Sequence, residues 1–150
     1  MQLIGMLDSP YVRRSAITLH LLDVPFEHKS VSVLTQIDEF SRISPVLKVP
    51  TLVLDDGSCL LDSNLIIDHA GELAGAGALL PLDPAARTAA RRALGYALAA
   101  CDKTVQAVYE YRMRPEEKRH APWLDRVRGQ ILAGRTLHRG SLLQDVDFGR

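Results

Sequence analysis

Three short segments in the first half of the chain combine residue types that could bind a small charged ligand. The first is Ser9-Pro10, which together with Asp8 ends the apolar run QLIGML. A turn into a helix at this point leaves unpaired backbone N–H groups and the positive end of the helix dipole, which favour an anion such as a thiolate. A serine hydroxyl there can donate a hydrogen bond to that anion. The alternative is plain capping, because serine is a preferred N-cap and proline is tolerated in the first turn.

The second segment is KVPTL at 48–52, which puts Pro50 directly before an apolar run. Proline lacks the N–H that a strand ladder needs, so it is expected only at the start or the edge of a strand. A cis Val49-Pro50 bond would leave the backbone N–H and C=O of Val49 available to pair with a peptide-like ligand in the manner of a strand. The alternative is an ordinary proline at the start of a strand.

The third segment is LDSNLI at 61–66, where Asp62 and Ser63 begin an expected helix. Ser63 can cap the first turn, and the free N–H groups of that turn can bind a ligand carboxylate. Asp62 could pair with a ligand ammonium. An acid next to a hydroxyl at a helix start therefore matches the two charges of an α-amino acid end group, and plain capping is again the alternative.

An alternation of strands and helices must position these segments, as judged from apolar periodicity and turn signals. The Asp-Gly turn between PTLVL and SCLL is a strong hairpin signal. The expected elements are a strand over QLIGML, a helix carrying Val12, Ala16, Leu19 and Leu22, an exposed or edge strand over 27–33, a short helix over 36–43, the hairpin, and a helix from Asp62-Ser63.

The composition changes after the Gly-rich stretch GELAGAGALLP, where Ala and Arg come to dominate. We therefore divide the chain into a domain over 1–76, a linker over 77–84 and a helical domain over 85–150. One helix is expected from about Pro84 to Met113, and another from Glu116 or Pro122 to about Leu143. The fold class expected is α/β followed by all-α, with a βαβαββα N-terminal domain of the usual small-domain size.

Composition limits the classes of partner. Of the 150 residues, 47% are apolar, and 18 basic side chains balance 18 acidic ones. A chain without net charge has no long-range field that favours nucleic acid or an anionic membrane surface, so neither partner is expected. The first residues do not read as a signal peptide, and the longest apolar run, ALGYALAAC, is too short to span a bilayer. We expect a soluble cytoplasmic protein.

Two cysteines and five histidines give no metal-ligand spacing. Cys59 and Cys101 stand far apart in the chain, which excludes a CxxC pair, fits a reducing compartment and predicts buried or half-buried thiols. No metal is expected. The adjacent Arg13 and Arg14 cannot share one helix face, and we expect them in solvent or surface ion pairs, with support of an anionic ligand or a dimer contact as the alternative.

The order of these features resembles the cytosolic glutathione transferase family, in its serine-type, bacterial-like form. Ser-Pro, Val-Pro before a strand, an acid-Ser pair, LLP and a helical segment follow one another over roughly residues 1–145, and SPVLKVPTLVLDDGSCLLDSNLI is the most specific part. The resemblance implies a thioredoxin-like first domain, glutathione as co-substrate, an electrophilic small molecule held between the domains, a detoxification role and a homodimer. It also implies further helices beyond residue 150, so that the C-terminal domain here is shortened.

Carried over to this sequence, the resemblance assigns a role to each candidate residue. Leu47 and Asp62 depart from the family pattern, which more often has Gly and Glu or Gln there. The implied roles are the glutathione sulfur for Ser9, the cysteinyl part for Val49 and Pro50, the γ-glutamyl end for Asp62 and Ser63, the glycyl carboxylate for Lys48, and the second-substrate side for Tyr11, Tyr109 and Met113. For each of the last three, a plain core position is the more common alternative.

Three functions are compared on the basis of this resemblance. The first is glutathione transfer, in which Ser9 stabilises the thiolate that attacks the electrophile. The alternative is a non-catalytic binding or regulatory protein of the same fold, since fold does not settle activity. A cysteine-dependent thiol oxidoreductase is disfavoured, because a serine at the active turn cannot form the mixed disulfide which that chemistry requires.

Overall fold

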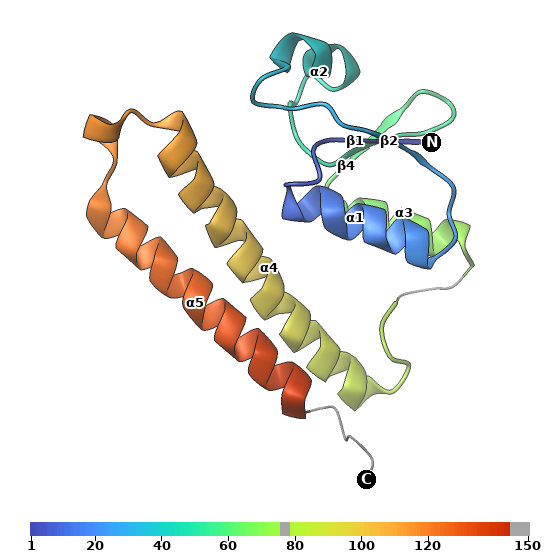
Figure 1. The fold of residues 1–150 in the computed structure, drawn as a ribbon. Helices are drawn as coiled ribbons and strands as arrows, with labels where there is room; N and C mark the ends of the chain where they lie inside the picture. The colour runs from blue at the N-terminus through green and yellow to red at the C-terminus, as the bar shows by residue number, and fades with distance from the viewer. Residues whose placement is uncertain (76–78, 145–150) are drawn as a thin grey trace. The chain divides into compact units, whose positions relative to one another are not determined.

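The computed structural model describes residues 1–75 and 79–144 and divides the chain into two compact units. Unit 1 is Met1–Leu79 and unit 2 is Leu80–Arg150. Unit 1 has the order β1 α1 β2 α2 β3 β4 α3, and unit 2 contains helices (Figure 1). The predicted fold class is therefore confirmed. The unit boundary falls within the predicted linker, of which residues 77 and 78 lie outside the described residues, as do 145–150 of the predicted helical domain.

The sheet of unit 1 has four three-residue strands in the order β2-β1-β3-β4. β1 is parallel to β2 and antiparallel to β3, and β3 is antiparallel to β4. Ile4 pairs with Thr51, and Thr51 pairs with Leu61. The chain therefore leaves β1, enters β3 and leaves β4 at the same end of the sheet. The strands are β1 (Gln2–Ile4), β2 (Glu27–Lys29), β3 (Thr51–Val53) and β4 (Cys59–Leu61).

Helices cover both faces of this sheet, α1 (Pro10–Leu21) and α3 (Ser63–Leu73) on one and α2 (Ile37–Ile43) on the other (Figure 1). Successive strand residues point to opposite faces, so Leu3 and Ile4 belong to different clusters. Ile4 packs with Phe40 of α2 and with Val31. The larger core joins Leu3 to Val12, Ala16, Leu19, Val24, Leu52, Ile66 and Ala70.

The edge strand β2 is shorter than predicted. The expected strand covered 27–33, but β2 ends at Lys29 and lies at the edge of the sheet, as predicted. Beyond Lys29 the side-chain oxygen of Ser32 accepts hydrogen bonds from the backbone N–H groups of Leu34 and Thr35. Serine competes with a strand ladder through such local bonds. The alternating sequence pattern therefore extends to residue 33, whereas the strand ends at Lys29.

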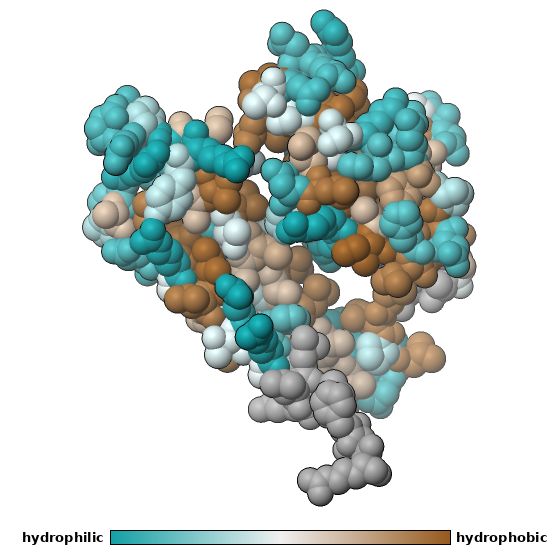
Figure 2. Space-filling view, in the orientation of Figure 1, coloured by the Kyte–Doolittle hydropathy of each residue, from teal (hydrophilic) through white to brown (hydrophobic). Residues whose placement is uncertain are grey.

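Unit 2 consists of α4 (Pro84–Met113), the short 3-10 helix η1 (Glu116–Lys118) and α5 (Ala121–Gln144). Asp83 caps α4 by accepting from the Ala86 N–H at 2.8 Å, and Pro84 occupies the first turn, so the predicted start of this helix is confirmed. α4 and α5 meet through small residues, and a Cβ at Gly134 would lie 3.1 Å from the Cβ of Ala100. Two helices alone bury few large side chains, and apolar surface remains exposed among polar residues (Figure 2).

Candidate functional site

The three candidate segments of the first half of the chain come together at one end of the sheet in unit 1. Ser9 follows β1, Lys48 to Pro50 precede β3, and Asp62 and Ser63 follow β4. Because Ile4, Thr51 and Leu61 are neighbours across the three strands, these segments leave the sheet side by side. Ser9 and Asp62-Ser63 lie beyond the carboxyl ends of β1 and β4, where ligands of open α/β sheets bind, whereas Lys48 to Pro50 precede the amino end of β3. Sheet register thus explains why residues distant in sequence are gathered here.

Ser9 caps α1, as one of the two interpretations of the sequence predicted. Its Oγ accepts a hydrogen bond from the Val12 N–H at 3.4 Å, and its backbone is extended, as an N-cap requires. A hydroxyl has one donor hydrogen and two acceptor lone pairs. Capping uses an acceptor position, and no hydrogen bond of the described residues uses the hydroxyl hydrogen of Ser9. The group can therefore cap the helix and still donate to an anion.

The Val49-Pro50 peptide bond is cis, which is one of the two alternatives that the sequence left open. Val49 is half-buried and packs against both hydrophobic clusters of unit 1. Among the described residues, no hydrogen bond involves its backbone N–H or C=O. Gly5 approaches Val49 so closely that a Cβ at Gly5 would lie 2.9 Å from a Val49 methyl carbon and 2.7 Å from one of Val12. A glycine at the end of β1 is what lets these two segments meet.

Lys48 and Asp62 form an ion pair that joins the second and third segments. Lys48 Nζ lies 3.1 Å from Asp62 Oδ2, and the other carboxylate oxygen accepts from the Asn64 N–H at 2.9 Å. The backbone hydrogen bond from Asn64, followed by the Lys48 side chain, holds the pKa of Asp62 below its ordinary value. Asp62 is therefore a carboxylate at neutral pH, as binding of a ligand ammonium would require. It is also the N-cap of α3, so the prediction that Ser63 is the cap was wrong.

Ser63 is instead the first residue of α3, and its side chain is held by Arg14. The Nη1 atom of Arg14 lies 2.9 Å from Ser63 Oγ and 2.7 Å from Asn64 Oδ1. The sequence analysis did not predict these two contacts of Arg14. The two partners are about 50 positions away in sequence, so helix spacing alone could not have found them. The one sequence feature that could have indicated this contact is a long polar side chain on the face of α1 that packs against α3.

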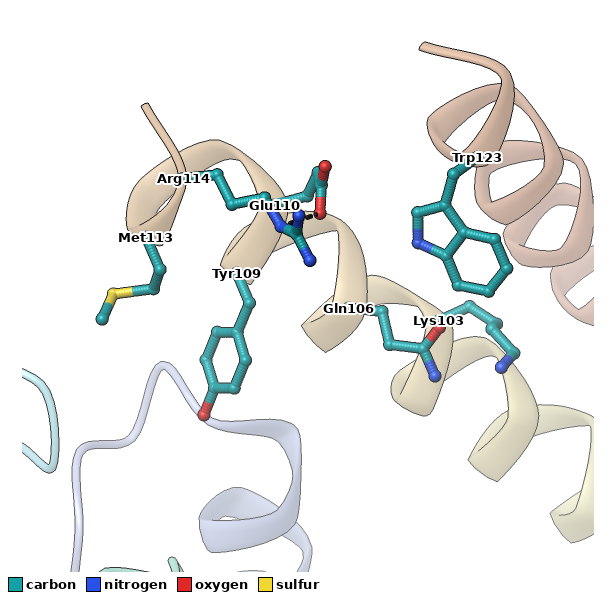
Figure 3. Close-up of a pocket in the computed structure, with 7 residues that line it drawn as sticks. All are labelled: Lys103, Gln106, Tyr109, Glu110, Met113, Arg114 and Trp123. Carbon is teal, nitrogen blue, oxygen red and sulfur yellow. Dashed lines mark ion pairs between the residues drawn. The ribbon is translucent and has the colours of Figure 1, made fainter. Parts of the chain in front are cut away.

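Two of the three candidates for the second-substrate side, Tyr109 and Met113, lie together on α4. They line a cavity of about 430 Å³ in unit 2, together with Trp123 of α5 (Figure 3). Glu110 is buried beside them and pairs with Arg114 at 2.8 Å. Sequence reasoning did not single out Trp123. Tyr11, the third candidate, is half-buried on α1 in unit 1. The remaining lining residues are Lys103, Gln106, Glu110 and Arg114.

The cysteines and the possible metal ligands add no further centre to this site. Cys59 is exposed on β4, where its thiol donates to the Ile43 carbonyl oxygen at 3.4 Å, so the prediction of a buried or half-buried thiol was wrong for Cys59 and right for the half-buried Cys101. Within residues 1–75 and 79–144, no three His, Cys, Asp or Glu side chains gather as metal ligands would. None of the described helices combines the length and the apolar character needed to cross a membrane.

The fold and this set of loops define a protein with a thioredoxin-like unit followed by a helical one. Residues 3–78 match the family model of the glutathione S-transferase N-terminal domain. This match covers 76 of the 150 residues. The chain belongs to the glutathione S-transferase family, which confirms the resemblance inferred from the sequence.

Several known proteins are similar to this chain. A glutathione S-transferase from Methylobacterium radiotolerans, solved in complex with glutathione sulfonate, is 33% identical with a TM-score of 0.79, over 90% of this chain and 63% of that one. A second, from Methylobacillus flagellatus with GSH bound, is 26% identical with a TM-score of 0.76, over 89% and 65%. The uncharacterized GST-like protein YibF of Escherichia coli is 33% identical over 84 residues, which are 56% of this chain and 42% of YibF. The chain thus spans less than two thirds of the length of these relatives.

Proposed function

We propose that this protein binds glutathione at the strand ends of unit 1 and uses Ser9 to stabilise the glutathione thiolate. The observation that carries the proposal is the state of the Ser9 hydroxyl. Its oxygen caps α1 through the Val12 N–H, whereas its hydrogen is unused among the described residues. A donor at a helix start favours a sulfur anion. The two solved relatives with glutathione sulfonate and GSH bound support the choice of ligand.

The same geometry suggests where each part of the tripeptide binds. The Val49 backbone, which no described hydrogen bond uses, is available to pair with the cysteinyl peptide unit. The Asp62 carboxylate suits the γ-glutamyl ammonium, and the start of α3 at Ser63 suits the γ-glutamyl carboxylate. Lys48 carries the charge for the glycyl carboxylate, although in the structure it pairs with Asp62. Binding of glutathione would therefore redistribute the contacts of Lys48.

The reaction proposed is transfer of glutathione to an electrophilic small molecule. Hydrogen bonding from Ser9 and the dipole of α1 lower the pKa of the bound thiol from its reference of about 8.5. The thiolate sulfur then donates its electron pair to the electrophilic carbon, a carbon–sulfur bond forms, and the leaving group departs with the electrons of its bond. Tyr109 and Met113, with Trp123, offer apolar and aromatic contacts of the kind that small-molecule sites use.

A non-catalytic binding or regulatory role is the second candidate. It is kept because the fold alone does not settle activity, and the similar YibF protein is itself described as uncharacterized. A detoxification role, a cytoplasmic location and a homodimer belong to the first candidate and are proposed with it. Light scattering at micromolar concentration tests the homodimer, for which a mass of twice 16.6 kDa is expected.

Calorimetric titration with glutathione tests the proposed function directly. The chain as given is expected to bind, and Ser9→Ala is expected to bind glutathione while losing the ultraviolet absorbance of the bound thiolate. Ser9→Thr is the matched control, because threonine keeps both the capping oxygen and the hydroxyl hydrogen. Loss of the cap in the alanine variant also costs about 1 kcal/mol of stability, so thermal unfolding must be measured in parallel.

The possible results separate the candidates. Absence of glutathione binding by the unmodified chain would exclude the transferase proposal and leave the binding or regulatory role. Binding with equal thiolate absorbance in the wild type and in Ser9→Ala would remove Ser9 from the mechanism. Thiolate absorbance together with product formation from a test electrophile would support transfer over mere binding.

A further inference from the structure

A cavity in unit 1 lies on the face of the sheet that α2 covers. Its volume is about 280 Å³, and none of the residues proposed to bind glutathione lines it. Ile4 packs with α2, and Gln2 shares its face because side chains two positions apart on a strand point the same way. Val53 pairs with Gln2 across the sheet and extends the floor to β3, and Ile43 of α2 adds an apolar wall. The register of the sheet thus sets a largely apolar base.

Two cations, Lys29 and Arg42, line the same cavity, and no carboxylate lines it. Lys29 is the last residue of β2 and is half-buried, whereas Arg42 is exposed in the last turn of α2. Among the described residues, no ion pair or hydrogen bond involves either side chain. The edge strand and α2 therefore bring two positive charges to one apolar cavity without supplying a partner for them.

Most carboxylates of the neighbouring segments are bound to other groups. The contacts are Glu27 with the Gln2 amide at 3.0 Å, Asp55 with the N-terminal ammonium at 2.6 Å, Asp56 with the Ser58 hydroxyl at 2.6 Å and Glu39 with the Gln36 amide at 2.9 Å. Asp38, one turn before Arg42, forms no ion pair with it within the part of the chain that the structure describes. An anion from outside the chain would supply the partner that both cations lack.

We propose that this cavity binds a small organic carboxylate, whose charge pairs with Lys29 and Arg42 and whose short apolar part covers Ile43 and Val53. The planar guanidinium matches the two oxygens of a carboxylate, and the ammonium adds a second charged donor. The apolar base favours an organic anion over a bare inorganic one. A volume of about 280 Å³ is small for a ligand site, which limits the ligand to a few carbon atoms. The site stands independently of the proposed glutathione binding, because the two share no residue.

Chemical-shift titration of the isotope-labelled full chain compares three probes. Isovalerate is the carboxylate, isovaleramide has the same branched carbon skeleton without the charge, and inorganic phosphate has the charge without the carbon skeleton. Isovalerate is expected to give saturable shifts of the backbone amides of Ile43, Val53 and Cys59. Isovaleramide is expected to bind about 10-fold more weakly or less, because it forms no charge-assisted hydrogen bond. Phosphate is expected to bind more weakly than isovalerate.

Two variants remove one cation each and keep the apolar stem. Arg42→Met and Lys29→Met are each expected to weaken isovalerate binding by about 10-fold, while the affinity for isovaleramide changes less than about 2-fold. Arg13→Met is the matched control, because Arg13 is an exposed cation on α1, which covers the other face of the sheet. It is expected to change neither affinity. Arg42 is exposed, so Arg42→Met serves as the test if circular dichroism shows that Lys29→Met does not fold.

The thiol of Cys59 gives a second measurement, because this exposed residue lines the cavity. In a Cys101→Ala background, isovalerate is expected to slow alkylation of Cys59 by uncharged iodoacetamide, and isovaleramide at the same concentration is not. Absence of saturable shifts, equal binding of isovalerate and isovaleramide, or unchanged affinity in both cation variants would overturn the proposal. Shifts confined to the residues around Ser9 and Val49 would overturn it too, since they would place the anion at the proposed glutathione site. Phosphate binding as tight as that of isovalerate would overturn the assignment of an organic ligand.

Discussion

Asp62 performs two structural tasks with one carboxylate. Its Oδ1 caps α3 through the Asn64 N–H, and its Oδ2 pairs with Lys48. Its backbone has φ of 75°, a region that residues other than glycine seldom adopt and that costs of order 1–3 kcal/mol. Aspartate tolerates positive φ better than most residues. The cap and the ion pair are what hold the residue in this conformation at the proposed site.

The lowered pKa of Asp62 predicts a pH dependence of stability. Because the pKa is lower in the folded state than its ordinary value of 3.8, the contribution is complete above that value and is lost as the pH falls through the folded pKa. Asp62→Asn keeps an oxygen for the cap but cannot carry the charge. At pH 7 the free energy of unfolding of the wild type is expected to exceed that of the variant by less than about 1 kcal/mol, because the side chains of both Asp62 and Lys48 are more than a third exposed.

Urea denaturation of both proteins between pH 7 and about pH 3 checks this expectation. The stability difference should shrink as the pH decreases. Asp68→Asn, which removes an exposed carboxylate from the same helix, is the control for the loss of one negative charge. A difference between wild type and Asp62→Asn that stays constant over the whole range would contradict the assignment.

Local chemistry in the sequence predicts some residue roles but not others. The cap at Ser9 follows from residue type and the proline after it, and that part was right. Asp62 and Ser63 are both good caps, and the choice between them depends on a backbone angle that residue type does not fix. The contact of Arg14 with Ser63 depends on how α1 and α3 pack. Polar contacts between distant elements need the register of the sheet before they can be inferred.

Gly5 at the end of β1 lets the Ser9 turn approach Val49. Its φ is +135°, and a Cβ would lie 2.7 Å from a Val12 methyl carbon. Gly5→Ala is therefore expected to destabilise unit 1 by at least about 1–3 kcal/mol, through overpacking added to backbone strain. Hydrogen exchange of the amides of β1 and β3 measures the effect.

Gly57→Ala is the matched control for Gly5→Ala. Gly57 also has a positive φ, +84°, but no atom would lie within 4 Å of its Cβ. Gly57→Ala is expected to destabilise the protein only by the backbone strain of alanine in that conformation, about 1–2 kcal/mol. Equal losses in the two variants would show that the close approach of Gly5 to Val12 and Val49 has no energetic weight.

Two glycines of α5 predict opposite responses in unit 2. A Cβ at Gly129 would meet no atom within 4 Å, so Gly129→Ala is expected to stabilise the helix by about 1 kcal/mol through its better helix propensity. A Cβ at Gly134 would lie 3.1 Å from Ala100 Cβ and from the Tyr96 carbonyl oxygen. Gly134→Ala is expected to lose that gain and to separate α4 from α5.

Thermal unfolding followed by far-ultraviolet circular dichroism compares the two glycine variants. The transition temperature should rise for Gly129→Ala and fall, or fail to rise, for Gly134→Ala. A similar rise in both would mean that the helix pair adjusts to the extra methyl group without loss. Element types in the chain were predictable from apolar spacing, whereas this contact of small residues was not, since glycine within a helix carries no signal of what faces it.

The charge balance of the whole chain predicts its behaviour in solution. With 18 basic and 18 acidic side chains and a pI near 7.0, molecules repel one another least near neutral pH. Solubility in the presence of polyethylene glycol is expected to be lowest near pH 7 and to increase toward pH 5 and pH 9. Lys118→Glu, at an exposed position in η1, should shift the minimum to lower pH. A minimum that does not move would contradict control by net charge.

The single tryptophan gives the two units different optical signals. Trp123 lies on α5 in unit 2, and of the four tyrosines only Tyr11 belongs to unit 1. Tryptophan emission during denaturation therefore reports the local environment in the helical unit and gives no direct signal from the thioredoxin-like one. Phe26 is half-buried and packs against the core of unit 1, so Phe26→Trp would supply the missing fluorophore. Spectroscopy could then follow each unit separately.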